Sequence, residues 1–158
     1  MSLRIGNMKI GIADTTFARV DMGKVAVETI QKNSSATVER YTVPGFKDLP
    51  VACKKLIEEH QCDIVLALGW VGKEAIDETC AHEANIGLIH AELMTNKHIL
   101  KLFFHESETS DKDEQKKICI DRVKKHARNA LELLKGKDAL RQFAGKGRRQ
   151  GYMDAGGI

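Results

Sequence analysis

Residues 64–69 are Ile-Val-Leu-Ala-Leu-Gly, a nearly continuous apolar run that ends at a glycine. Such a run is typical of a central strand in a parallel sheet, because helices cover both faces of that strand. Residues 8–14 and 99–104 form similar runs, and Val38, Tyr41 and Val43 mark a further strand that stops at a Pro-Gly pair. The sequence therefore predicts four strands.

Helices are predicted between and after these strands, because apolar residues there recur at intervals of three and four. The first helix has Met22, Val25, Ala26 and Ile30 on one face, the second has Leu49, Ala52, Cys53, Leu56 and Ile57, and the last has Ile120, Val123, Ala127, Ala130 and Leu134. Alternating strands and helices favour right-handed crossovers with helices on both faces of a sheet. We therefore expect a three-layer α/β/α fold with a four-stranded parallel sheet.

A long third helix is predicted over residues 77–95, and it carries two apolar stripes. One stripe holds Ile76, Cys80, Ala84, Leu88 and Ala91, and the other holds Ile86, Ile89 and Leu93. One stripe is enough to pack against the sheet. The second stripe therefore predicts a subunit interface in a homo-oligomer.

Composition sets the broad class of the protein. A chain of 158 residues with 42% hydrophobic and 30% charged residues is expected to form one globular domain, 1–158. The net charge of +3 is too small to argue for nucleic acid, and no apolar run approaches the roughly 20 residues that span a bilayer. Four cysteines without C-x-x-C spacing are expected to be reduced. We expect a cytoplasmic protein with no nucleic-acid or membrane partner.

The tail is basic, with six Lys or Arg residues over 135–149 against the single acid Asp138. Such a segment could bind phosphate or RNA, but it lacks the interleaved aromatic residues that stack on bases. We therefore expect 136–158 to form a solvated helix and arm, with packing on a neighbouring subunit as a further possibility.

Polar and aromatic residues follow the strands, at the edge where ligands bind in such sheets. After the first strand come Asp14, Thr15, Thr16 and Phe17, which could stack on a planar ring and bond to its edge. Alternatively, Asp14 or Thr15 caps the turn and Phe17 is buried. Together with the loops 44–50 and 69–74, this segment predicts a site for a flat, polar metabolite.

The other strand ends add binding and proton-transfer candidates. Phe46, Lys47 and Asp48 follow the second strand, and Gly69, Trp70 and Val71 follow the third. His105 and Glu106 end the fourth strand, and a histidine there has a useful pKa for proton transfer. The glycines match neither a P-loop nor G-x-G-x-x-G, and no His, Asp or Glu set has metal-ligand spacing.

Several of these segments resemble archaeal-type riboflavin synthase, a member of the lumazine synthase superfamily. The matching motifs are DTTFARVDM at 14–22, VPGFKDLPVACKKL at 43–56, CAHEA at 80–84, LMTNKHI at 93–99 and AGKG-x-RQG at 144–151. They extend from the first strand to the tail. The resemblance implies a flavodoxin-like, lumazine-synthase-like form of the α/β fold.

One departure distinguishes the two branches of this superfamily. Lumazine synthases have a catalytic histidine six residues before the Asn of their A-N-E-A motif. His82 stands at the position of that Asn, and six residues before it is Ile76. The resemblance therefore implies riboflavin synthase, which uses no phosphorylated substrate, rather than lumazine synthase.

The implied reaction is a dismutation of two 6,7-dimethyl-8-ribityllumazine molecules. One donates a four-carbon unit to the other, giving riboflavin and 5-amino-6-(D-ribitylamino)uracil without an organic cofactor; a role for Mg²⁺ is left open. Relatives are pentamers with sites between subunits, so residues 93–99 of a neighbour are expected to complete each site.

Roles then follow by position in the sequence. His105, Glu106 and Asp14 are the proton-transfer candidates. Phe17 and Trp70 would stack on the rings; Thr15, Thr16 and the backbone of 69–71 would bond their edges; and Asp48, with the amides of Phe46 and Lys47, would hold a ribityl chain. The alternatives are lumazine synthase, a non-catalytic lumazine- or flavin-binding protein of the same fold, and an RNA-binding scaffold.

Overall fold

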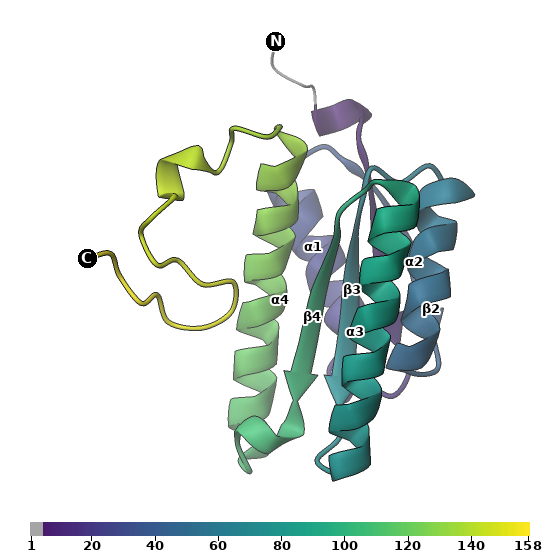
Figure 1. The fold of residues 1–158 in the computed structure, drawn as a ribbon, viewed down its shortest axis with the longest axis vertical. Coiled ribbons are helices and arrows are strands. Elements are labelled where there is room, and N and C mark those ends of the chain that lie inside the picture. Colours follow the sequence, from purple (N-terminus) through teal and green to yellow (C-terminus); the bar gives the residue numbers. More distant parts are fainter. Residues whose placement is uncertain (1–4) are drawn as a thin grey trace.

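A computed structural model describes residues 5–158, in which four strands form one parallel sheet (Figure 1). The strands are β1 (Lys9–Thr15), β2 (Thr37–Val43), β3 (Ile64–Val71) and β4 (Ile99–His105). Their order is β2-β1-β3-β4, so β1 and β3 are central. All eight residues of β3 are buried, as the opening apolar run predicts.

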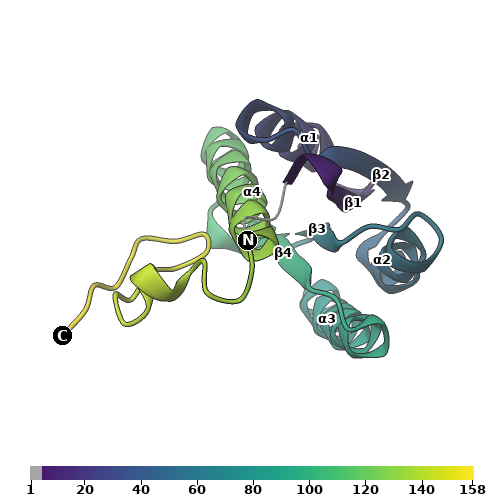
Figure 2. The same ribbon diagram turned by 90° about the horizontal axis from the view of Figure 1, so that it is seen from above.

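In the part of the chain that the structure describes, four α-helices cover the sheet, two on each face, as Figure 2 shows. They are α1 (Met22–Asn33), α2 (Leu49–Glu58), α3 (Ala75–Thr95) and α4 (Lys112–Leu134). Helices α1 and α4 pack on one face and α2 and α3 on the other. The predicted three-layer α/β/α fold is therefore confirmed.

The core has two halves, one on each side of the sheet. Ile12, Leu66 and Phe104 face α1 and α4, whereas Ala13, Val65 and Ile99 face α2 and α3. This division follows from the strand itself, because successive side chains point to opposite faces. The predicted inner face of α2 is fully confirmed, since all five of its residues are buried.

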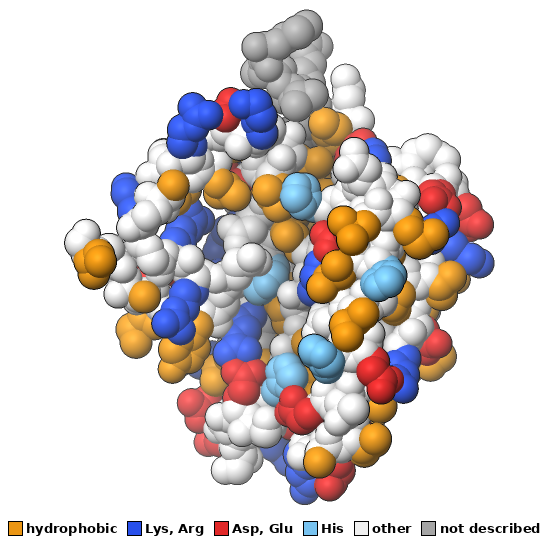
Figure 3. Space-filling model, viewed as in Figure 1, with side chains coloured by type: hydrophobic (Ala, Val, Ile, Leu, Met, Phe, Trp, Pro, Cys, Tyr) orange, Lys and Arg blue, Asp and Glu red, His pale blue; other side chains and the backbone are white. Residues whose placement is uncertain are grey.

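Helix α3 differs from the prediction in its first turn. Ile76 is 66% exposed, and Ala81 rather than Cys80 is buried there, together with Ala84, Leu88 and Ala91. The second stripe is exposed as predicted, and Figure 3 shows apolar side chains gathered along this helix. Ile86, Ile89 and Leu93 form an exposed apolar strip on the outer face of the helix.

The tail, predicted as a helix and arm over 136–158, has no α-helix beyond Leu134 in the described residues. After α4 it contains one 3-10 turn, η4 (Arg141–Phe143), and otherwise runs as an irregular arm beside α4 (Figure 1). Glycines at positive φ, including Gly136, Gly145 and Gly147, interrupt any longer helix. The arm closes on itself through a hydrogen bond from the Ala155 amide to the Gly147 carbonyl, of 2.8 Å.

Candidate active site

The loops after β1 and β2 are joined at the carboxyl edge of the sheet. The Thr16 amide donates to the Val43 carbonyl at 2.9 Å, and the Phe17 amide donates to the Pro44 carbonyl at 3.2 Å. The Thr16 hydroxyl also donates to the Pro44 carbonyl, at 3.3 Å. These bonds hold the Phe17 ring at the edge with 52% of the residue exposed, so it is free to meet a ligand.

Asp14 lies under this loop rather than in an open pocket. It is 3% exposed and accepts hydrogen bonds from Arg40 at 2.5 Å and from Thr42 at 2.6 Å. Arg40 also donates to Asp21 at 2.7 Å, and Asp21 caps α1 by accepting from the Lys24 amide. Arg40 therefore clamps both ends of the loop 14–21.

The site is tightly packed around this clamp. A Cβ atom on Gly23 would lie 2.4 Å from an Asp14 carboxylate oxygen and 2.5 Å from Arg40 Nε, so a side chain there would displace the clamp. Thr15 is also buried, and its hydroxyl accepts from the Ala18 amide at 3.3 Å. The capping alternative therefore describes Thr15, whereas Phe17 is not buried.

Glu106 lies beside a hollow on the α4 side of the sheet. Its carboxylate accepts from Trp70 Nε1 at 2.8 Å and from Arg19 at 3.3 Å. The hydrogen bond from Trp70 and the guanidinium of Arg19 hold the pKa of Glu106 below its ordinary value. The hollow has a volume of about 350 Å³, and its lining includes the cations Arg19 and Lys73.

The prediction that Trp70 lies in a loop is wrong. Strand β3 continues to Val71, which pairs with His105 of β4, and this pairing draws Trp70 into the sheet. Trp70 is 1% exposed, and its ring lies 4.7 Å from that of Phe104. In this chain Trp70 holds the Glu106 carboxylate through a hydrogen bond, and its buried ring has no exposed face on which a ligand ring could stack.

His105 points to the other face of the sheet, toward α3. Its Nδ1 lies 2.7 Å from a carboxylate oxygen of Glu78, and Ser107 donates to the second oxygen of Glu78 at 3.2 Å. A histidine held at one ring nitrogen by a carboxylate keeps the other nitrogen oriented for proton transfer. His105 and Glu106 therefore do not meet in one pocket of the single chain.

The segment after β2 also lies on the α3 side. The Phe46 ring is 5.8 Å from that of Phe103, and Lys47 forms an ion pair of 3.0 Å with Glu83 of α3. Asp48 accepts from the Gly45 amide at 3.3 Å, which closes η2 (Phe46–Asp48).

These features can be compared with known proteins. Residues 7–138 match the model of the 6,7-dimethyl-8-ribityllumazine synthase family. The chain belongs to this family.

Relatives within the lumazine synthase family fall into two groups. The riboflavin synthase of Archaeoglobus fulgidus is 50% identical over 96% of this chain and 99% of its own. That of Methanothermobacter thermautotrophicus is 52% identical over 94% of this chain and 98% of its own. The 6,7-dimethyl-8-ribityllumazine synthase of Methanopyrus kandleri is 31% identical over only 51% of this chain and 60% of its own.

The family-model match and the Archaeoglobus fulgidus match differ in how much of the C-terminal arm they include. The family model ends at residue 138, whereas a match to 151 of 158 residues in the Archaeoglobus fulgidus protein necessarily includes Gly151. The part of the arm up to Gly151 is thus shared with that relative. In residues 5–158, no helix of this lumazine synthase family member is long and apolar enough to cross a membrane.

Sequence reasoning missed the residues that hold these groups in place. Arg40 and Phe103 lie in strands, Glu78 lies in the first turn of α3, and none follows a strand end in the sequence. One of these contacts could have been predicted, because the parallel pairing of β1 with β2 places Thr42 beside Asp14. The partnership of Glu78 with His105 depends on the packing of α3 and has no local signature.

Proposed function

We propose that this protein is an enzyme, a riboflavin synthase, which transfers a four-carbon unit between two molecules of 6,7-dimethyl-8-ribityllumazine. The observation that carries the proposal is the match at 50–52% identity over nearly the whole chain to proteins named riboflavin synthase. Matches to lumazine synthases are partial. The apolar, exposed Ile76 at the position expected for the lumazine synthase histidine supports the same assignment.

His105 is the preferred proton-transfer group. The reaction needs a base near the acidic C7 methyl of one lumazine and an acid for the partner ring. Glu78 fixes one nitrogen of His105 and leaves the other for this exchange. Glu106 stays ionised as an acceptor for Trp70 and Arg19, and Asp14 remains in its clamp with Arg40, so both act by holding the loops.

Much of the remaining rate enhancement is expected to come from holding the two substrate rings in the right orientation. Holding two heterocycles face to face replaces a bimolecular encounter, a contribution of up to roughly 7–11 kcal/mol in ideal cases. The exposed Phe17 would stack on one ring, with Thr16 and the backbone at Gly69 and Val71 near its edge. Phe46, Lys47 and Asp48 would hold a ribityl chain. Because the two products together contain the atoms of two substrates, no external oxidant is required.

The active form is proposed to be a homopentamer with sites between subunits. The exposed strip of Ile86, Ile89 and Leu93 supplies an apolar surface for a neighbour. Residues 93–99 of that neighbour would then face the strand ends of the next chain. This arrangement would bring a second set of side chains to the half-site around His105.

The direct test incubates purified, assembled protein with 6,7-dimethyl-8-ribityllumazine and follows both products by chromatography. We expect two lumazines to be consumed for each riboflavin and each 5-amino-6-(D-ribitylamino)uracil formed. Binding of lumazine without turnover would favour a binding protein of this fold. No riboflavin, with or without Mg²⁺, would contradict the proposal.

A further inference from the structure

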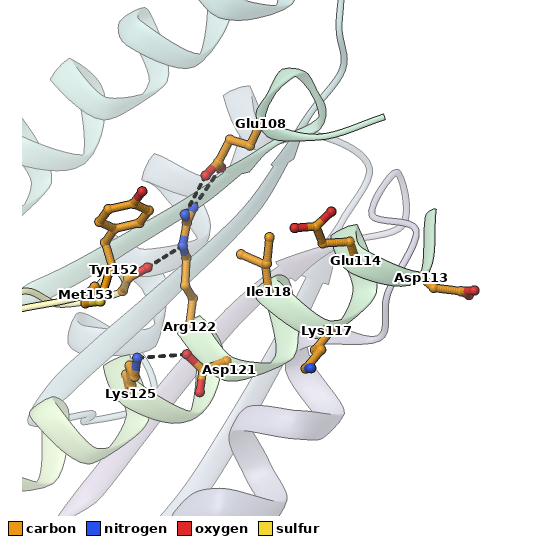
Figure 4. A pocket seen from close by; sticks show the side chains of 11 residues that line it. Glu108, Asp113, Glu114, Lys117, Ile118, Asp121, Arg122, Lys125, Tyr152 and Met153 are labelled. Carbon is orange, nitrogen blue, oxygen red and sulfur yellow. Dashed lines mark hydrogen bonds and ion pairs between the residues drawn. The ribbon is translucent and has the colours of Figure 1, made fainter. Parts of the chain in front are cut away.

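Arg122 of α4 contacts three separate parts of the molecule, and Figure 4 shows its contacts with Glu108 and with the arm. Two of its guanidinium nitrogens donate to the two carboxylate oxygens of Glu108, one of them at 2.7 Å. Its Nε donates to the carbonyl of Gly151 in the arm at 2.6 Å. The guanidinium carbon lies 5.8 Å from the centre of the Phe104 ring, within the range of a cation–π contact.

Two of these contacts, to Glu108 and to Phe104, lead to the strand-end turn that carries His105 and Glu106. Glu108 accepts from the backbone amide of His105 at 3.2 Å, so its position fixes the start of the turn η3 (Glu106–Glu108). Phe104 packs on Trp70, and Trp70 donates to Glu106. Arg122 therefore reaches the segment of His105 and Glu106 by two routes.

The contact between Arg122 and Gly151 of the arm is closely packed. A Cβ atom on Gly151 would lie 2.8 Å from Arg122 Cγ and 3.0 Å from its Cδ, so a side chain there would displace the arginine. Arg122 has three directed contacts and a side chain only 15% exposed, and it cannot move without breaking one of them. Gly151 belongs to the segment shared with the riboflavin synthase of Archaeoglobus fulgidus and lies beyond the family-model match.

We propose that Arg122 is a positioning residue that couples the C-terminal arm to the turn bearing His105 and Glu106. The proposal rests on the riboflavin synthase function for its kinetic consequences. Arg122 touches neither His105 nor the Glu106 carboxylate; it acts through Glu108, Phe104 and Trp70. A placement error of about 1 Å in a catalytic group costs on the order of a hundredfold in rate.

The test uses full-length Arg122→Met, Arg122→Lys and Gly151→Ala, with Lys124→Met as the control on the exposed side of the same helix. Arg122→Met should lower kcat at least about tenfold, change KM much less, and shift the pH profile of kcat. Arg122→Lys should recover part of kcat, because lysine can pair with Glu108 but cannot also bond the arm. Gly151→Ala should resemble Arg122→Met although every charge is kept.

Trp70 gives a readout that does not depend on activity, because it is the only tryptophan and lies under Phe104 beside Glu106. Its fluorescence should change in Arg122→Met and in Gly151→Ala and stay as in the wild type in Lys124→Met. If Arg122→Met does not fold, the same measurements on Gly151→Ala test the coupling. Wild-type fluorescence and an unchanged kcat and pH profile in Gly151→Ala would overturn the coupling. An inactive wild-type protein would instead contradict the riboflavin synthase function, and the fluorescence comparison would still test the coupling.

Discussion

His105 and Glu106 are neighbours in the sequence, yet their side chains serve opposite faces of the sheet. His105 contacts Glu78 of α3, whereas Glu106 accepts from Trp70 and Arg19 on the α4 side. Strand alternation at the end of β4 causes this separation. The two residues therefore have different expected roles, which single substitutions can distinguish.

The first prediction concerns His105. His105→Ala should lower kcat by about 10²–10⁴, the usual contribution of general acid–base catalysis. Glu78→Gln should lower kcat by a smaller factor, because the imidazole stays but loses its orienting carboxylate. His60→Gln, at the far edge of the sheet beside Lys9, is the control. Steady-state kinetics decide, and a His105→Ala enzyme with wild-type kcat would contradict the role.

The second prediction uses the pKa of Glu106. The hydrogen bond from Trp70 lowers this pKa in the folded protein, so the contribution of Glu106 to stability is complete above the unfolded value, about 4.3. This stabilising contribution is lost as the pH falls through the lower pKa that Glu106 has in the folded protein. Trp70 fluorescence should therefore change on acidification below about pH 4. This transition should be smaller in Glu106→Gln and unchanged in Glu28→Gln, in samples whose circular dichroism shows a retained fold. The part left in Glu106→Gln is expected from Glu108, whose pKa is also lowered and which pairs with Arg122.

The third prediction concerns the clamp of Arg40 on Asp14. Arg40→Met leaves a carboxylate that is 3% exposed without its cation. Loss of one partner from a buried pair costs roughly 3–5 kcal/mol, and we expect about 2 kcal/mol here because Arg40 is partly exposed. Urea unfolding measures the difference, with Lys32→Met on α1 as the control. Equal stability of the two variants would show that the clamp does not stabilise the loop.

At the scale of elements, α3 is the least self-sufficient part of the fold. It buries Ala81, Ala84, Leu88 and Ala91 against the rest of the chain and exposes an apolar strip on its other side. A helix with two apolar faces needs a second partner, since water solvates only the polar remainder. β3 is the opposite case, because both of its faces are covered within the chain.

The fourth prediction follows from that strip. Ile89→Asp should dissociate the oligomer, because a buried carboxylate without a partner is strongly unfavourable. The fold of the chain should be retained, since Ile89 is 45% exposed and the core residue Leu88 is unchanged. Sedimentation velocity measures assembly and circular dichroism measures folding. Gln31→Asp on α1 adds the same charge elsewhere and should leave the oligomer intact.

At the scale of the whole molecule, the candidate site residues of one chain lie in two groups, one on each side of the sheet edge. The hollow beside Glu106 has about 350 Å³, near the lower limit of roughly 300 Å³ for small-molecule pockets. The side around His105 and Phe46 lies next to α3, the helix that exposes the apolar strip. A complete site for two ribityllumazines is therefore expected to need a neighbouring chain.

The fifth prediction tests this sharing of sites. The variants His105→Ala and His98→Ala should each have reduced riboflavin synthase activity. His98 is expected to act in the site of a neighbouring subunit, because it lies in the segment 93–99. When the two variants are dissociated and reassembled together in equal amounts, about a quarter of the sites in a ring should hold both intact residues. Riboflavin formation should then exceed that of either variant. Activity equal to the average of the two would indicate sites within single chains.

The sequence by itself determined the layers, the parallel sheet and the edge where the site lies. These depend on short-range periodicity and on strand-end loops, which composition and spacing record directly. Its motifs also identified the family. Only the tertiary structure decided that Trp70 is buried, that Asp14 is clamped by Arg40, and that His105 and Glu106 face apart. Those outcomes depend on β3–β4 pairing and on partners far away in the chain, because hydrogen bonds between distant residues leave no periodic trace in the sequence.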